Sequence, residues 1–294
     1  MASSKYVTGS EYDRAAMSWT SELAAALGAQ VATAEHVAGG DINDAFRVRL
    51  ADHRVVFVKT HADAPAGMFA AEATGLDWLR AGPLQIPRVL AAGASWLALE
   101  WLELTAAMPR HGLAVLGRGL ARLHQLGAPA FGFPADNFLA TLPQHNAAAP
   151  TWPEFYVERR LRPLAELGRA RGRMPDVRAA LDALAARPDR FGPPEPPARL
   201  HGDLWWGNVA ACDGEPVLID PAVYGGHREV DLAMLALFGE LPEVLLGAYR
   251  EVCPLAEGWR DRLPLHQLYP LTAHAVLFGG GYGSRAARIL AALR

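Results

Sequence analysis

The hydrophobic pattern of the chain changes about a third of the way along. Up to residue 102 most segments alternate apolar and polar residues, as in "AFRVRL" and "VVFVK", which is the period of a half-buried β-strand. From Gly112 the apolar residues recur at spacings of three and four, as in "GLAVLGRGLARLHQL", which is the period of an amphipathic helix. A sheet-forming part followed by a helical part, within 294 residues, predicts a two-lobed α+β fold.

The first part also contains two segments of helical periodicity. One runs from Met17 to Leu27, and the other, from Ala64 to Arg80, interrupts the predicted strands. The letters "ADHR" between two strand-like segments predict a hairpin turn. We therefore expect a small lobe over residues 1–102, with a mostly antiparallel sheet and one inserted helix, and a larger, mainly helical lobe over residues 103–294.

A proline-rich segment, "RPDRFGPPEPPARL", comes before the most polar motif of the chain. It could link two domains, or it could approach the next element along the surface of one lobe. We favour the second interpretation, because the motifs on its two sides belong together.

Composition and charge exclude several classes of partner. The net charge is −3 and no long run of one sign occurs, which argues against nucleic acid or an anionic membrane as the main partner. Two cysteines, Cys212 and Cys253, are too few for a disulfide framework and lack metal-ligand spacing. No signal peptide is recognisable, and the longest uncharged stretch, residues 266–283, is broken by proline and glycines. We expect a cytoplasmic protein.

Three features of the first lobe could together bind an anion. Gly39 and Gly40 form a glycine turn whose N–H groups could approach a phosphate closely. Lys59 stands at the end of an apolar strand, and Glu72, on the following helix, could pair with its ammonium group. Taken singly, each feature also fits an ordinary turn, a solvated lysine or a surface glutamate.

The stretch "HGDLWWGN", followed by "IDPA", carries the strongest signal for chemistry. Asp203 and Asn208 stand five residues apart, and Asp220 follows a predicted strand. This order is what a phosphoryl-transfer centre requires: one carboxylate takes the proton of the attacking hydroxyl, while the asparagine and the second carboxylate bind Mg²⁺. Each residue alone could instead cap a turn. We expect His201 to brace the catalytic loop by hydrogen bonds rather than to transfer protons.

The order of these motifs resembles the kinase-like phosphotransferases of the aminoglycoside and choline-kinase type. More narrowly, the sequence resembles the fructosamine-3-kinase (ketosamine kinase) family. The blocks that carry this resemblance span nearly the whole chain; they are "GGDIN", "FGFPADNFLATLPQHN", "HGDLWWGN", "DPAVYGGHREVDLAMLALFG" and "LFGGGYG".

The resemblance implies ATP-dependent phosphorylation of the O3 hydroxyl of ketosamines, the products of sugars with amines, after which the product breaks down and frees the amine. It implies that Asp203 is the catalytic base and that Asn208 and Asp220 hold Mg²⁺. The ATP-binding residues that it implies are Lys59 with Glu72, the glycine turn, and a hinge whose backbone binds adenine, at Glu100, Trp101 and Leu102.

Two positions depart from the family pattern. Some members have a cysteine in the glycine-rich loop that makes them responsive to redox state; the nearest residue here is Asp41, so we expect no such switch. The residue after Trp205 is commonly small in the family, and here it is Trp206. We expect Trp205 to face the substrate, whereas Trp206 could stack on the sugar, narrow its pocket or pack against helices.

Three charged residues of the block after Asp220 have open roles. Arg228 and Glu229 could form an exposed ion pair, or they could shape the substrate end of the cleft and contact substrate. We expect Asp231 to support the structure by stabilising the start of the helix that follows, as an N-terminal carboxylate.

Two other functions compete with a ketosamine kinase. The first is a kinase for another small hydroxyl compound, such as an aminoglycoside, choline or a sugar, because acceptor choice depends on loops of the second lobe. The second is a pseudokinase that binds nucleotide without turnover; it would lack at least one of Lys59, Asp203, Asn208 and Asp220, and all four are present. We expect a monomer that binds a small-molecule or protein-bound ketosamine.

Overall fold

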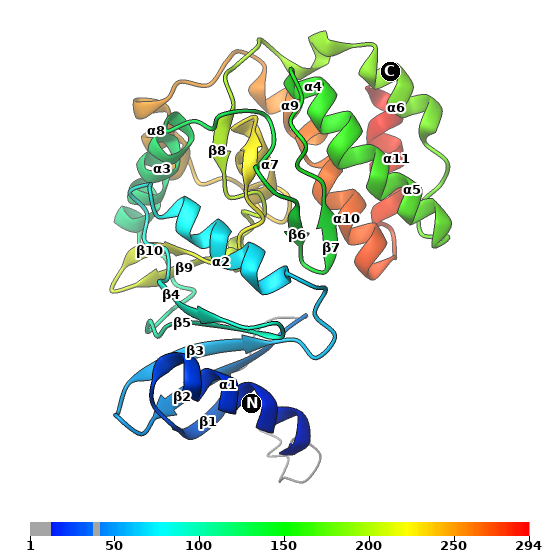
Figure 1. Cartoon of the computed structure of the whole chain (residues 1–294). Coiled ribbons are helices and arrows are strands. Elements are labelled where there is room, and N and C mark those ends of the chain that lie inside the picture. Colours follow the sequence, from blue (N-terminus) through cyan, green and yellow to red (C-terminus); the bar gives the residue numbers. More distant parts are fainter. Residues whose placement is uncertain (1–12, 38–41, 294) are drawn as a thin grey trace, which may run out of the picture. The chain divides into compact units, whose positions relative to one another are not determined.

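The computed structural model describes residues 13–37 and 42–293 and shows a mixed α+β protein (Figure 1). The five strands of the largest sheet all lie in the first hundred residues, and helical residues outnumber strand residues in the remainder, as the change in hydrophobic period predicts. Within the described residues, no helix is at once long enough and apolar enough to cross a membrane.

The chain divides into two compact units. One contains the residues up to Ala73 together with Arg88–Leu102, and the other contains Thr74–Pro87 together with the residues from Glu103 onward. Helix α2 (Met68–Leu79) therefore begins in the first unit and ends in the second. Separate roles for the two lobes, nucleotide binding in the first and catalysis in the second, stay a prediction.

The first unit is built on a five-stranded sheet in which all neighbouring strands are antiparallel. Its spatial order is β1-β2-β3-β5-β4. The two hairpin-connected strands at its centre flank the predicted "ADHR" turn. The elements of this unit are α1 (Asp13–Leu27), β1 (Val31–Val37), β2 (Asp44–Leu50), β3 (Val55–Thr60), β4 (Val89–Ala92) and β5 (Trp96–Glu100).

The two faces of the sheet have different roles because side chains alternate along each strand. Trp19 and Leu23 of α1 pack with Val56 and Val58 of β3 in the core of the first unit. Lys59 follows Val58 in the same strand, so it points to the opposite face, away from this core. The alternation of side chains in β3 therefore places Val56 and Val58 in the core and Lys59 on the other face of the sheet.

The second unit is mainly helical and also contains short strand pairs. Its helices are α3 (Arg110–Gln125), α4 (Trp152–Phe155), α5 (Arg162–Ala170), α6 (Arg178–Ala185), α7 (Glu229–Leu235), α8 (Glu243–Val252), α9 (Trp259–His266), α10 (Leu268–Phe278) and α11 (Tyr282–Ala292). The 3₁₀ and π segments are η1 (Tyr156–Leu161), η2 (Pro188–Phe191) and η3 (Trp206–Asn208). The strand pairs are β6–β7 (Asn137–Leu139, Leu142–Gln144), β8–β11 (Ala198–Leu200, Tyr224–Gly226) and β9–β10 (Val209–Cys212, Glu215–Leu218).

Several of these elements differ from the sequence-based expectation. The pairs β6–β7 and β8–β11 have strands of three residues, which are too short to show a period. Helix α9 was not predicted, and it contains Pro264. Between α4 and α5 the chain forms the π-helix η1, which the change in hydrophobic period does not indicate.

The proline-rich segment lies wholly within the second unit, so it does not connect the two units. It forms η2, whose Phe191 is buried in the main core with residues of α4, α5 and α10. The interpretation of this segment as an approach to the next element of one lobe is therefore correct, and the interpretation as an interdomain linker is wrong.

Helices α3 and α8 lie side by side at one edge of the second unit (Figure 1). Their close approach depends on Gly117, because a Cβ atom at this position would stand 2.2 Å from the carbonyl oxygen of Leu245. Gly247, on α8, has no atom within 4 Å of its Cβ position.

These two glycines give a matched pair of substitutions. We expect Gly117→Ala to push α8 from α3 and to lower the free energy of unfolding by about 1–3 kcal/mol, the usual cost of overpacking. Gly247→Ala should raise it by up to about 1 kcal/mol, because alanine favours an exposed helix interior over glycine. Urea denaturation of both variants measures the difference, and equal effects would show that Gly117 is not a packing constraint.

Candidate active site

Lys59 and Glu72 form a close ion pair within the first unit. The ammonium Nζ lies 2.5 Å from Oε1 of Glu72. Lys59 is only 4% exposed, so its charge needs an anionic partner. Glu72 reaches it from α2, which is anchored by the buried Phe69 and Leu76 on either side of it in sequence. The pair predicted from sequence therefore exists, and its contact with ATP stays a prediction.

The other nucleotide-binding residues predicted in this unit are only partly described. Gly39 and Gly40 lie outside the described residues. Glu100 is the last residue of β5, and its carboxylate accepts hydrogen bonds from the backbone N–H and from Nε of Arg88 at 2.9 and 2.8 Å. Trp101 and Leu102 follow the strand end, where only their backbone is proposed to bind adenine.

The segment from His201 to Asn208 joins strand β8 to η3 in the second unit. The side-chain amide of Asn208 ties this segment together: it donates to the backbone oxygen of Asp203 at 2.8 Å and to its Oδ2 at 3.1 Å. The same amide donates to the backbone oxygen of Asp220 at 3.4 Å. The structure thus brings together the three residues that the sequence predicted to carry the chemistry.

Backbone geometry limits which residues can occupy this loop. Gly202 has a φ of +82°, and a Cβ atom there would stand 2.0 Å from the carbonyl oxygen of Ala222. Asp220 adopts a φ of +54°, which is uncommon for a residue other than glycine. Such backbone conformations cluster at functional sites, where the surrounding contacts must hold them.

The carboxyl group of Asp203 does not titrate like an ordinary aspartate. Desolvation and the nearby negative charge of Asp220 raise its pKa to about 7, although the hydrogen bond from Asn208 acts in the opposite direction. A general base is most effective when its pKa lies near the working pH. The environment of Asp203 therefore suits proton abstraction at neutral pH.

The donor set of the loop fits a hard divalent cation. The two N–H groups of the Asn208 amide face three acceptor oxygens, so the amide oxygen is the atom that could bind a metal ion. The carboxylate of Asp220, which is exposed, supplies a second oxygen. Mg²⁺ prefers oxygen ligands and retains several waters, so two protein ligands suffice.

A buried carboxylate, Asp231, anchors the catalytic loop from behind. It accepts the backbone N–H groups of His201 at 2.8 Å and Gly202 at 3.0 Å, and the Nε2 of His124 lies 3.2 Å from it. His124 contacts the hydroxyl of Tyr249 through its Nδ1 at 2.8 Å. Asp231 lies in the first turn of α7, as the sequence predicted, but its oxygens serve the loop rather than the helix terminus.

His201 connects the two halves of the loop. Its Nδ1 accepts the backbone N–H of Asp203 at 3.3 Å, and its Nε2 lies 2.9 Å from the carbonyl oxygen of Ile219, the residue before Asp220. The ring is fully buried, and this burial lowers its pKa. A neutral imidazole with one donor and one acceptor nitrogen satisfies both contacts, and neither nitrogen is directed toward a proton-transfer partner.

The two tryptophans of the loop have different surroundings. Trp205 is 39% exposed; its indole covers Gly207 and meets the ring of Phe238 nearly edge-on at 6.1 Å. Trp206 is half-buried, and its indole nitrogen lies 3.9 Å from the Cβ position of Gly239. Trp206 therefore packs against the segment that follows α7, whereas Trp205 presents an aromatic surface to solvent.

Arg228 and Glu229 do not pair with each other. The guanidinium of Arg228 binds both oxygens of Glu195 at 2.6 and 2.7 Å, and both oxygens of Glu229 bind Arg262 at 2.6 and 2.9 Å. Arg228 is 8% exposed and Glu229 is fully buried. The expectation of an exposed ion pair is therefore wrong, because each residue finds a partner more than thirty positions away in sequence. A contact with substrate stays a prediction for both.

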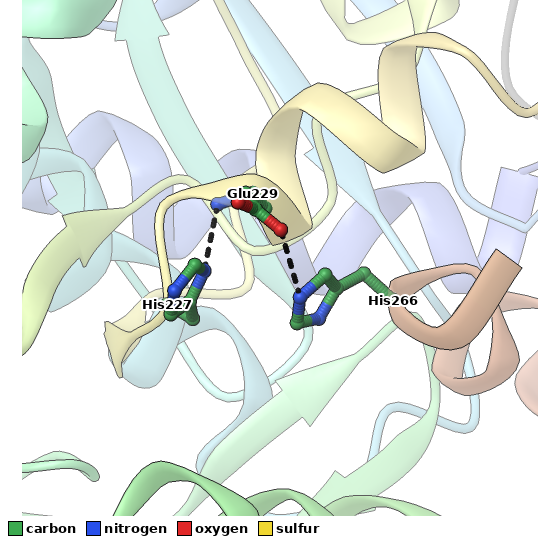
Figure 2. Close-up of side chains that lie close together, drawn as sticks. All are labelled: His227, Glu229 and His266. Carbon is green, nitrogen blue, oxygen red and sulfur yellow. Dashed lines mark hydrogen bonds and ion pairs between the residues drawn. The ribbon is translucent and has the colours of Figure 1, made fainter. Parts of the chain in front are cut away.

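Figure 2 shows Glu229 between two buried imidazoles, His227 and His266. The Nδ1 of His227 accepts the backbone N–H of Glu229, and Nε2 of His266 lies 3.4 Å from Oε2 of Glu229. These residue types could hold a metal ion. However, both carboxylate oxygens already bind Arg262, whose charge would repel a cation. We therefore interpret the group as a buried ion network.

Burial gives this network a strong dependence on pH. Desolvation, followed by the influence of His266, lowers the pKa of His227 to about 4. Desolvation would raise the pKa of Glu229, but the contact with His266 and the hydrogen bonds from Arg262 outweigh it and lower the pKa to about 2. Both shifts favour the folded protein near neutral pH, since His227 is neutral there and Glu229 is ionised.

The contacts of His124 and Tyr249 were missed by the sequence analysis. His124 is 3% exposed and lies on the apolar face of α3, among buried leucines such as Leu120 and Leu123. A histidine on such a face is the signal that could have identified it, since a buried imidazole needs hydrogen-bond partners.

We predict that His227 makes the protein sensitive to acid. Between pH 7 and pH 5 the unfolded chain protonates this histidine and the folded chain does not, so the free energy of unfolding falls by about 2 kcal/mol from this residue. His227→Gln should lose that part of the acid sensitivity, whereas the exposed His111→Gln should retain it. Urea titrations at both pH values measure it; an unchanged difference in His227→Gln would contradict the prediction.

Comparison with known proteins supports a single family. The model of the fructosamine kinase family matches residues 15–294. A probable ketoamine kinase of Enterococcus faecium is 39% identical over 263 residues, which cover 86% of this chain and 92% of that protein. A probable ketoamine kinase of Thermus thermophilus is 40% identical over 246 residues, covering 83% and 87% of the two chains.

Comparison with solved structures gives the same family. A fructosamine-3-kinase homologue from Thermobifida fusca superimposes with a TM-score of 0.86 at 42% identity, covering 94% of this chain and 98% of that chain. A macrolide 2'-phosphotransferase, at 19% identity, has a TM-score of 0.61 and covers 95% and 97%. The second likeness shows the fold, which is that of protein-kinase-like phosphotransferases. The chain belongs to the fructosamine kinase family and is a kinase that transfers phosphate to a hydroxyl group.

Proposed function

We propose that the protein uses ATP and Mg²⁺ to phosphorylate the O3 hydroxyl of the sugar part of ketosamines, such as fructosamines or ribulosamines. The phosphorylated product then breaks down and frees the amine, so the activity reverses glycation. One observation carries the proposal: in a chain of the fructosamine kinase family, the amide of Asn208 joins the backbone and carboxylate of Asp203 to the backbone of Asp220.

In this proposal Asp203 accepts the proton of the attacking hydroxyl. Its raised pKa keeps the carboxylate basic enough for this step near neutral pH. The hydrogen bond from Asn208 orients the carboxylate, and the contacts of His201 and Asp231 hold the backbone N–H groups of Asp203 and Gly202. The side chain is therefore fixed before an acceptor arrives, which reduces the entropic part of the barrier.

Asn208 and Asp220 would hold the metal through their side-chain oxygens. A bound Mg²⁺ neutralises charge on the phosphate groups of the nucleotide. Lys59, paired with Glu72 in the first unit, would supply a cation for nucleotide phosphates.

The acceptor would bind on an aromatic row that begins at Trp205. The ring of Trp205 contacts Phe238, which contacts His274 at 5.4 Å, and His274 contacts Phe278 at 5.5 Å. Nδ1 of His274 bonds the backbone oxygen of Pro270 at 2.8 Å, so its Nε2 is the nitrogen that could accept a hydrogen bond from a ligand. Aromatic faces with a hydrogen-bond acceptor among them suit a sugar attached to an amine.

We further propose that the protein is a monomer in the cytoplasm, with ketosamines as its partners and without a nucleic-acid or membrane partner. Size-exclusion chromatography with light scattering would measure the first of these directly.

The catalytic role of Asp203 predicts a large loss of activity in Asp203→Asn. With Mg-ATP and a panel of fructosamines and ribulosamines, we expect ADP release to fall roughly 10²–10⁴-fold, which is the usual contribution of a general base. Asp213→Asn is the matched control: it changes an exposed aspartate in a turn, at a φ of +51° that asparagine tolerates.

Two outcomes would count against the proposal. Equal ADP release by wild type and Asp203→Asn would contradict the mechanism. Turnover of aminoglycosides or choline, but of no ketosamine, would contradict the substrate class while leaving the kinase chemistry in place.

Trp205 should determine how tightly the acceptor binds. Trp205→Ala removes an exposed ring that is not part of the core, so we expect the acceptor KM to rise about 10-fold, as for loss of one stacking contact, with little change in stability. Leu126→Ala removes another exposed apolar side chain, just after the end of α3, and should leave the KM unchanged. An unchanged KM in Trp205→Ala would remove this residue from the acceptor site.

A further inference from the structure

Arg160 is a buried cation that forms no ion pair with an acidic residue among the described parts of the chain. It lies in the π-helix η1 and is 0% exposed. An arginine withdrawn from water needs compensating contacts, because its charge remains at any physiological pH. None of the roles assigned above uses this residue.

Aromatic rings and oxygen atoms provide this compensation. The guanidinium carbon lies 4.0 Å from the ring centre of Tyr224, 4.5 Å from that of Phe155 and 5.5 Å from that of Tyr269. Cation–π attraction is strongest where water is excluded, as it is here. One terminal nitrogen also donates to Oδ1 of Asn146 at 2.6 Å.

The first route from Arg160 to the catalytic loop runs through Tyr224. The ring of Tyr224 stacks against the guanidinium of Arg160. The ring of Tyr224 also passes close to Gly202, since its Cε1 lies 3.1 Å from the Cβ position of that glycine. Gly202 immediately precedes Asp203, so a shift of this ring reaches the backbone of the proposed base.

The second route is a chain of buried amides. Asn146, held by Arg160, donates to Oδ1 of Asn137 at 2.8 Å, and Gln144 donates to the same oxygen at 2.7 Å. Gln144 donates further to the carbonyl oxygen of Ala222 at 3.1 Å, and Asn137 donates to that of Val223 at 2.8 Å. All three amide side chains are at most 5% exposed.

The two routes end on the same backbone. The N–H of Ala222 donates to the carbonyl oxygen of His201 at 2.9 Å, which joins the segment after Asp220 to the segment before Asp203. Tyr224 lies two residues beyond Ala222. The buried guanidinium of Arg160 is therefore connected to two backbone segments, the one that leads to Asp203 and the one that follows Asp220.

We propose that Arg160 is a positioning residue for phosphoryl transfer, which holds the backbone at residues 201–203 and 220–224 in register through the Tyr224 ring and the Asn146–Asn137–Gln144 amide chain. This inference rests on the proposed function, since it concerns the same site. Arg160 touches no reacting atom in this role. Its planar guanidinium stacks on rings and donates in fixed directions, and a lysine ammonium cannot reproduce both contacts.

The test compares three variants with wild type under saturating Mg-ATP. Arg160→Met removes the charge at similar length, Arg160→Lys keeps the charge without the planar group, and Gln144→Leu breaks the amide chain at a second point. We expect kcat to fall about 10- to 100-fold in Arg160→Met, as for a displacement of catalytic groups by a fraction of an ångström, with the acceptor KM changed by less than about 2-fold. Arg160→Lys should recover little of the loss.

A matched control separates positioning from stability. Leu161→Ala truncates the neighbouring buried side chain of η1, which is outside the amide chain, and should destabilise the fold while leaving kcat of the folded enzyme unchanged. The double variant Arg160→Met/Gln144→Leu should lose no more activity than the more impaired single variant, because both act through one network.

Other results would overturn the inference. These are a kcat within about 2-fold of wild type in folded Arg160→Met, a loss matched by Leu161→Ala at equal stability, or multiplicative losses in the double variant. If Arg160→Met does not fold, Arg160→Lys and Gln144→Leu decide by the same criteria. ADP release is measured with a ketosamine and also with water as the only acceptor. If the substrate class is wrong, wild type will show no ADP release above the water rate with the ketosamine. The positioning role is then still tested by comparing the water rates of wild type and the variants.

Discussion

The geometry of the site depends on one buried anion, the carboxylate of Asp231. It accepts two successive backbone N–H groups, from His201 and Gly202, and it contacts His124 on α3. A carboxylate that receives several donors in the interior is held more firmly than any surface ion pair, because water cannot compete for those donors. Through His124 and Tyr249 the same anion also connects α7, α3 and α8, so the loop is attached to three helices at one point.

Around this anchor, close contacts between backbones also position the loop. Gly202 passes against the carbonyl of Ala222, and a Cβ atom at Gly225 would stand 2.1 Å from the carbonyl oxygen of Ala130. Within the pair β8–β11, a Cβ atom at Gly226 would stand 2.6 Å from Cδ1 of Leu200. Backbone packing of this kind leaves little freedom to move, which suits a site whose reacting groups must be placed within fractions of an ångström.

The sequence predicted the features that depend on local spacing. The order of strand and helix predicted the ion pair of Lys59 with Glu72. The five-residue spacing predicted that Asp203 and Asn208 act together, and their side chains form a hydrogen bond. Partners distant in sequence were not predictable, because no periodicity encodes them: Asp231 meets His124 across 107 positions, and Arg228 meets Glu195 across 33. Strands of three residues, such as β6 and β7, are likewise defined by their neighbours and not by their own pattern.

The π-helix η1 has a consequence for how this protein can change over evolution. The continuous helical segment from Trp152 to Ala170 turns its residues by about 100° each in its α-helical parts and by less in η1, so η1 sets the phase between the two ends. With this phase, Phe155 before η1 and Leu164 after it both lie in the same hydrophobic core. Loss of one residue within η1 would rotate everything beyond it by about a quarter turn, so the length of this segment is fixed more strictly than the identity of most of its side chains.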